Sequence, residues 1–252
     1  MDQTQPVTET PAVTSFMTRV TNVFSSPGEL YTEVASAPSQ TTSWLVPLLC
    51  SLILGIVFTF ALYNNPVLRQ QIYDVQEEGM RKAVAQGQMT QEQMDTASER
   101  MESSGPAMFM LIGGGSTVVI LAISFFGASL VLWLSAKFIL KFNGSYKKML
   151  EVFGLAAMVG VLGSVITLLM MNMLNSMHAT PGGALLIMDS FDRGNMGHKL
   201  LASVNIFTLW QTGIIGIGLS KLSGKSTGTT LGLAFALWAL WAIVSSLLGW
   251  VR

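Results

Sequence analysis

The sequence predicts an all-α fold: a polytopic integral membrane bundle of five transmembrane helices, with N-terminal amphipathic helices and an extramembrane helical hairpin. Half of the residues are hydrophobic and only 11% are charged, against about 25% in a typical soluble domain. Apolar runs recur along the chain. Each can supply the roughly 20 residues with which a helix crosses a hydrocarbon core of about 30 Å. The predicted spans are 44–63, 107–140, 149–174, 200–219 and 228–251.

The polar segment 1–43 precedes the predicted membrane domain 44–252. Between Val13 and Phe24, apolar residues recur at steps of three and four, which is helical periodicity, and Pro27 ends the pattern. A second short apolar stripe follows. We expect two amphipathic helices in the membrane interface, with Arg19 as the only base on the polar face of the first. The alternative is that both pack on the protein's own membrane domain. The side chains expected to enter lipid are Phe16, Met17, Val20 and Phe24.

The segment 64–105 is polar and acidic, and we interpret it as a solvated helical hairpin. Pro66 suits the first position of a helix, and Gly87 interrupts the pattern. Thr90 and Gln93 have the spacing of a capping box, in which each side chain satisfies an unpaired backbone donor. This spacing predicts that a second helix begins at Gln91.

The second apolar run, 107–140, is too long for one untilted crossing, because a continuous helix of that length would extend about 51 Å. Glycine destabilises a helix relative to alanine, so Gly113–Gly115 marks a weak point. We expect the crossing to be Thr117–Leu140, with residues 107–115 bending away from it or extending out of the bilayer.

Basic residues predict the orientation. They gather in two tight turns, 137–148 and 221–225, and short loops rich in lysine stay in the cytoplasm. The N-terminus lies on the same side as these turns if the chain crosses five times. The hairpin, the loop 175–199 and the C-terminus are then expected outside.

Small residues recur at four-residue steps in two predicted spans and would let helix backbones approach closely in lipid. The alternative is that they line a substrate path. Polar residues within or at the ends of spans are expected to face the bundle. The helix-packing residues are Ala156, Gly160, Ser164, Thr212, Gly216 and Ser220, and the polar in-membrane residues are Asn172, Asn205 and Gln211.

Catalytic patterns are weak, so we expect no enzyme, no cofactor and no metal. Residues 223–227 end like a phosphate-binding loop but lack its upstream glycine and its strand. The outer-loop residues His178, Asp189, Asp192 and His198 could ligate a metal, yet nothing in their spacing fixes a geometry. Equal numbers of acidic and basic residues argue against nucleic acid as a partner. The lone Cys50 excludes an internal disulfide.

Three segments carry a resemblance to a known family. They are Phe24–Tyr31 with its Ser-Ser-Pro-Gly core, Tyr146–Gly154, and Asn205–Trp210 followed by Gly213, Gly216 and Gly218. In these segments, and over nearly its whole length, the chain resembles the Yip-domain family, named for interaction with Ypt/Rab GTPases, and is more similar to the bacterial branch. Many relatives carry aspartate where Asn205 stands, which speaks against a charged functional group at that position.

The resemblance implies five spans, a cytoplasmic N-terminus and a bacterial inner membrane, which is the cell membrane. Eukaryotic relatives are linked to Rab GTPases and vesicle traffic, a pathway that bacteria lack, so that partner does not transfer. We expect a non-enzymatic scaffold or organiser that contacts the lipid bilayer and unidentified membrane or cytoplasmic proteins, with a homo-oligomer left open. The alternative is a transporter or channel subunit. The spans lack a central charged residue, which argues against a proton-coupled pump but not against a channel.

Overall fold

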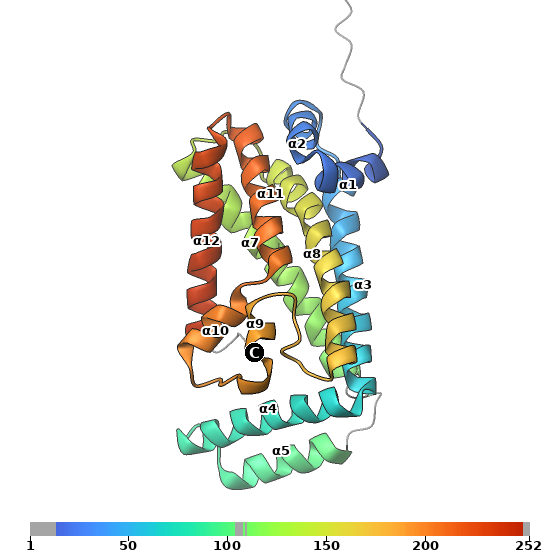
Figure 1. Cartoon of the computed structure of the whole chain (residues 1–252), viewed down its shortest axis with the longest axis vertical. Coiled ribbons are helices and arrows are strands. Elements are labelled where there is room, and N and C mark those ends of the chain that lie inside the picture. The colour runs from blue at the N-terminus through green and yellow to red at the C-terminus, as the bar shows by residue number, and fades with distance from the viewer. Residues whose placement is uncertain (1–13, 104–107, 109, 249–252) are drawn as a thin grey trace, which may run out of the picture. The chain divides into compact units, whose positions relative to one another are not determined.

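The computed structural model of the chain describes residues 14–103, 108 and 110–248 (Figure 1). The described residues are helical, with turns and one isolated antiparallel bridge between Gly182 and Asn205, and they include no β-strand. Two compact units form, and the long helices contribute residues to both. The first unit is Met1–Leu48, Phe126–Val159 and Trp210–Trp238; the second is Leu49–Phe125, Gly160–Leu209 and Ala239–Arg252.

The N-terminal helices belong to the first unit. Helix α1 (Phe16–Ser25) begins where the Ser15 hydroxyl accepts a hydrogen bond from the Thr18 amide, and α2 (Pro27–Ser36) has proline at its first position. The two helices contact each other. The predicted start near Val13 lies outside the described residues.

Both N-terminal helices bury part of their apolar stripe in the protein. Val23 of α1 is fully buried, and α2 buries Leu30, Tyr31 and Val34. The placement of Arg19 on a solvated polar face is wrong, because its side chain is 1% exposed. Of the side chains predicted to enter lipid, Met17 is 71% exposed, whereas Phe16, Val20 and Phe24 are half-buried. Their contact with lipid stays a prediction.

Four helices in the described part of the chain are long and apolar enough to cross a membrane, judged by length and composition. They contain α3 (Thr42–Asn64), α7 (Gly115–Ile139), α8 (Tyr146–Leu174) and α12 (Thr227–Leu247). The prediction of a multi-pass, all-α membrane protein is confirmed to this extent. The candidate spans are Thr42–Asn64, Leu111–Ile139, Tyr146–Leu174 and Thr227–Leu247.

The fourth predicted span, 200–219, has the wrong start. Residues 200–203 belong to the separate helix α10 (Met196–Ser203), and α11 runs over Ile206–Ser223. The side chain of Asn205 accepts a hydrogen bond from the Phe207 amide at 2.9 Å and so caps the new helix. With 18 residues, α11 extends about 27 Å. It also carries Gln211 and Lys221, so the fifth crossing stays a prediction.

The glycine-rich weak point changes the helix type without ending the helix. A π-helical turn, η1 (Met110–Gly114), leads directly into α7. The helix therefore continues through residues 111–115, and the start of the membrane crossing at Thr117 stays a prediction. At these glycines the backbone hydrogen bonds have the π-helical pattern, and the helix continues without a break.

The second unit contains α4 (Pro66–Ala85) and α5 (Gln91–Ser103), which contact each other as the predicted hairpin requires. The capping box is confirmed: the Thr90 amide donates to Gln93 Oε1 at 2.9 Å and the Gln93 amide to Thr90 Oγ1 at 3.2 Å. Between α8 and α11 the chain forms α9 (Gly183–Leu186), η2 (Met188–Ser190) and α10. Leu68, Met171 and Ala179 form a buried apolar cluster in this unit.

Candidate functional site

A buried arginine joins three helices of the first unit. Arg19 of α1 donates from Nε and Nη2 to Glu33 Oε1 of α2, at 3.2 and 2.8 Å. Its Nη1 atom donates to Ser43 Oγ of α3 at 2.8 Å. Arginine presents its donors in a rigid planar fork, which allows one side chain to hold several acceptors at once. Arg19 therefore fixes both N-terminal helices to the start of α3.

A second acid and a second base complete this charge cluster, which consists of Arg19, Glu33, Lys148 and Glu151. Glu151 lies in the second turn of α8 and is fully buried. Its carboxylate oxygens are 3.8 Å from Arg19 Nη1 and 3.8 Å from Lys148 Nζ. The formal charges of the cluster cancel, which limits the cost of removing them from water.

Lys148 also caps the C-terminal end of α2. Its ammonium group donates to the carbonyl oxygens of Val34 and Ala37. The last carbonyls of a helix have no partner within the helix and carry partial negative charge, so a cation is favourable there. Lys148 thereby links α2 to α8 independently of Arg19.

Glu33 is held in its charged form. Burial alone would raise its pKa, but hydrogen bonds from Thr14 and Arg19 outweigh burial and hold the pKa below its ordinary value. Thr14 donates from its amide at 3.0 Å and from its hydroxyl at 2.7 Å. A carboxylate that accepts several hydrogen bonds while paired with arginine is a stable partner at neutral pH.

Tyr31 adds an uncharged contact between α2 and α8. It is fully buried, and its hydroxyl donates to the Val152 carbonyl at 3.0 Å. Burial raises the pKa of this hydroxyl, which stays protonated. A side chain at Gly218 of α11 would meet the same region, because its Cβ would lie 2.6 Å from Val152 Cγ1 and 3.3 Å from the Tyr31 ring.

Sequence reasoning missed the charge cluster, although one signal was present. Lys148 and Glu151 are three residues apart at the start of an apolar run. A carboxylate there needs a partner, so the pair indicated a buried ionic site. Nothing local pointed to Arg19, because α1 and α8 are far apart in the sequence.

The predicted packing residues lie in different environments. Ala156, Thr212 and Gly216 are buried, as is Ser220 at 8% exposure, whereas Gly160 and Ser164 are half-buried. At Gly216 a Cβ would lie 2.7 Å from Leu231 Cδ2 and 3.0 Å from Leu231 Cα, so α11 and α12 approach closely there. Ser220 instead donates to the Lys225 carbonyl at 2.8 Å, across the turn between these helices.

Two of the three polar in-membrane residues lie at helix ends. Asn205 caps α11, and Asn172 is in the last turn of α8. Gln211 lies inside α11 and is half-buried. The bundle-facing role predicted for all three stays a prediction.

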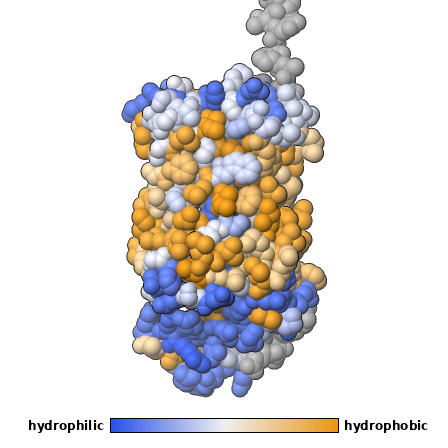
Figure 2. Space-filling view, viewed as in Figure 1, coloured by the Kyte–Doolittle hydropathy of each residue, from blue (hydrophilic) through white to orange (hydrophobic). Residues whose placement is uncertain are grey.

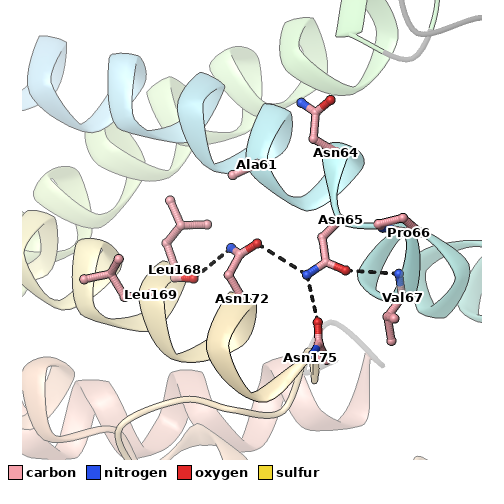
Figure 3. A pocket seen from close by; sticks show the side chains of 9 residues that line it. All are labelled: Ala61, Asn64, Asn65, Pro66, Val67, Leu168, Leu169, Asn172 and Asn175. Carbon is pink, nitrogen blue, oxygen red and sulfur yellow. Dashed lines mark hydrogen bonds between the residues drawn. The ribbon is translucent and has the colours of Figure 1, made fainter.

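Asn172 lines a pocket of about 680 Å³ in the second unit (Figure 3). The pocket lies at the end of α3, the start of α4 and the end of α8. Asn65 Nδ2 donates to Asn172 Oδ1 at 3.4 Å and to Asn175 Oδ1 at 3.0 Å, so three amides form one chain. The lining residues are Ala61, Asn64, Asn65, Pro66, Val67, Leu168, Leu169, Asn172 and Asn175.

The two histidines between α8 and α11 contact an aromatic ring. The His178 ring stacks on Phe191 with centroids 4.0 Å apart, and His198 Nδ1 accepts from the Asp192 amide at 3.0 Å. Burial, with the charge of Arg193, holds the pKa of His178 below its ordinary value. Within the described ranges, no three His, Cys, Asp or Glu side chains gather in a way that could hold a metal.

Large apolar side chains are exposed along the candidate spans, and the visible face of these helices is mostly hydrophobic (Figure 2). Ile53 of α3 is 62% exposed and Ile123 of α7 is 67% exposed. Exposed apolar surface on this scale is unfavourable in water and favourable against lipid. The hydrophilic surface of α4 and α5 contrasts with it.

Comparison with known proteins identifies one family. The family model described as the Yip1 domain matches residues 21–250. No curated protein and no solved structure matches the chain.

Proposed function

This chain belongs to the Yip1 domain family, and from that membership we propose that it is a non-enzymatic scaffold or organiser in the membrane. It acts through protein and lipid contacts, and its partners are membrane or cytoplasmic proteins. The observation that carries the proposal is the charge cluster. It fastens α1 and α2 to α3 and α8 within one unit, so the N-terminal helices form a fixed surface.

A fixed surface suits a docking role. Binding is weakened by the entropy of ordering a mobile segment, and a pre-ordered helix avoids that loss. The outer face of α1 carries Met17, which is 71% exposed, beside the exposed Thr18 and Thr21. An exposed methionine adapts its shape to different partners. We infer that this face of α1 is the contact surface of the scaffold.

We also propose five crossings of the cell membrane, with the N-terminus cytoplasmic and the C-terminus outside. The first unit contains the N-terminal helices, the turn before α8 and the turn before α12. The second contains the α4–α5 hairpin, the segment between α8 and α11 and the end of α12. This alternation, together with the lysines of the two turns, supports the proposal. Segment 1–43 and membrane domain 44–252 are the corresponding proposed domains.

The test is capture of the tagged full chain from native membranes, followed by quantitative mass spectrometry. Met17→Asp should lose the partner proteins, because a carboxylate opposes an apolar contact. Ala35→Asp places the same charge at an exposed position of α2 and should keep them. The folding of both variants is checked by thermal unfolding. Equal capture by both variants, or solute flux in proteoliposomes of the purified chain, would contradict the scaffold.

A further inference from the structure

We propose that the asparagine-lined pocket of the second unit binds one glycerolipid molecule. The ester and glycerol region of the lipid meets the amides, and an acyl chain lies along the apolar wall. This inference does not depend on the scaffold role.

The position of the pocket points to a lipid. Asn64 is the last residue of one candidate span, and Asn172 lies two residues before the end of another. Span ends lie where the hydrocarbon core meets the polar interface. The same boundary runs through each glycerolipid, between its acyl chains and its ester groups.

The wall of the pocket is apolar, and its side chains are exposed at the surface of the described structure. Leu169 is 57% exposed and Val67 is 48% exposed, and both line it with Ala61 and Leu168. The space is an open groove of about 680 Å³, so it contacts one side of a ligand and does not enclose it. It therefore holds the middle portion of a lipid and leaves the rest of each acyl chain in the bilayer.

The amides keep hydrogen-bonding capacity for a ligand. Asn172 donates one N–H group to the Leu168 carbonyl at 2.9 Å, and an amide has a second. The bonds within the described chain engage only Oδ1 of the Asn175 side chain, which leaves both of its N–H groups. Ester carbonyls are acceptors and match these donors. Figure 3 shows Asn65, Asn172 and Asn175 gathered on one side of the pocket.

The amides are held in place before a ligand arrives. Asn65 Oδ1 accepts from the amides of Val67 and Leu68, at 3.0 and 3.3 Å, and so caps α4. Asn175 adopts a left-handed backbone conformation with φ of 52°, which asparagine tolerates better than most residues. Its carbonyl accepts from Gln71 Nε2 at 2.9 Å. Binding therefore requires little ordering of the site.

Charge plays no part in this recognition, because none of the nine lining residues is charged. The lining residues offer no positive charge that would favour an anionic head group over a neutral one. The lipid is recognised through its uncharged ester region, and head groups of different charge should bind equally.

The experiment reconstitutes the full chain in phosphatidylcholine nanodiscs with a small fraction of a photoactivatable phosphatidylcholine. Its diazirine lies on the acyl chain close to the ester. After irradiation, adducts are mapped by mass spectrometry. We expect the peptides with Ala61 and Leu168 to be labelled several-fold more than lipid-exposed positions of α12. Leu169→Trp fills the pocket and should remove this excess. Leu162→Trp, the matched change two turns earlier on α8 at an exposed residue outside the pocket, should not.

Uniform labelling of the spans would overturn the proposal, since it would reflect the surrounding lipid alone. Equal labelling in the two tryptophan variants would also overturn it. A phosphatidylglycerol probe of the same design tests whether the affinity comes from the ester region or from the charge of the head group. Equal labelling by both probes supports recognition of the ester region, and a strong preference for the anionic probe contradicts it.

Discussion

Arg19 is a buried charge that joins α1 to α2 and α3. It is buried among Glu33, Ser43 and Glu151, and its removal takes the paired cation from Glu33 and leaves Glu151 with Lys148. Breaking a buried ion pair by deleting one partner costs about 3–5 kcal/mol, because the remaining charge stays desolvated. We expect Arg19→Ala to lower the free energy of unfolding by about this amount, measured by unfolding of the purified protein in detergent.

An exposed arginine is the matched control for this change. Arg81 pairs with Glu77 at 2.6 Å, but its side chain is 69% exposed. Exposed ion pairs contribute about 0–1 kcal/mol. The free energy of unfolding of Arg81→Ala should therefore be nearly that of the wild type. If both variants unfold alike, the charge cluster does not hold the N-terminal helices.

Glu33 gives the first unit a defined response to acid. The pKa of Glu33 is lowered in the folded protein, so its contribution to stability is complete above its ordinary value of 4.5. The contribution is lost as the pH falls below that value and through the lower folded-state pKa. We expect the melting temperature of Glu33→Gln to lie below that of the wild type at neutral pH, and this difference to narrow only below pH 4.5. If the two melting temperatures are already equal at pH 6, this assignment is contradicted.

The residues that the sequence predicted well are those with local partners. Thr90 and Gln93 cap one helix start, and three-residue spacing is enough to predict it. Arg19 has partners on α2, α3 and α8, which only the tertiary structure brings together. Its amphipathic helix pattern suggested a solvated base, because periodicity places a side chain on a face but does not say what covers that face.

At the scale of elements, glycines set how closely α11 approaches its neighbours. A Cβ at Gly216 would meet Leu231, whereas a Cβ at Gly213 on the same helix would meet nothing within 4 Å. Overpacking a close contact costs about 1–3 kcal/mol. We expect Gly216→Leu to lower the unfolding temperature in detergent and Gly213→Leu to leave it unchanged or raise it. The reverse order would mean that α11 packs through its other face.

Most helices were predictable from the sequence, but the start of α11 was not. Runs of apolar residues and the Pro66 and Gly87 signals placed most elements correctly. The start of α11 was wrong because residues 200–203 are as apolar as those of a span, although they form the end of α10. Asn205 decides the boundary through one hydrogen bond, and hydropathy does not register such a cap.

At the scale of the whole molecule, the distribution of charged and apolar residues is that of a membrane-spanning protein. The candidate spans expose large apolar side chains, and the basic turns before α8 and α12 belong to one unit. The central claim is that α11 also crosses, which gives five crossings and ends on opposite sides. Its length of about 27 Å suits the hydrocarbon core closely.

Cysteine accessibility tests this claim most directly. Single cysteines are placed in a Cys50→Ser background at Ala85, Ser190, Ser145 and Lys225, which are all exposed. An impermeant thiol reagent is applied to intact cells that express the chain. We predict that Ala85→Cys and Ser190→Cys are labelled, and that Ser145→Cys and Lys225→Cys are labelled only after the membrane is permeabilised. Labelling of Lys225→Cys in intact cells, together with Ser190→Cys, would show that α11 does not cross and would contradict the account.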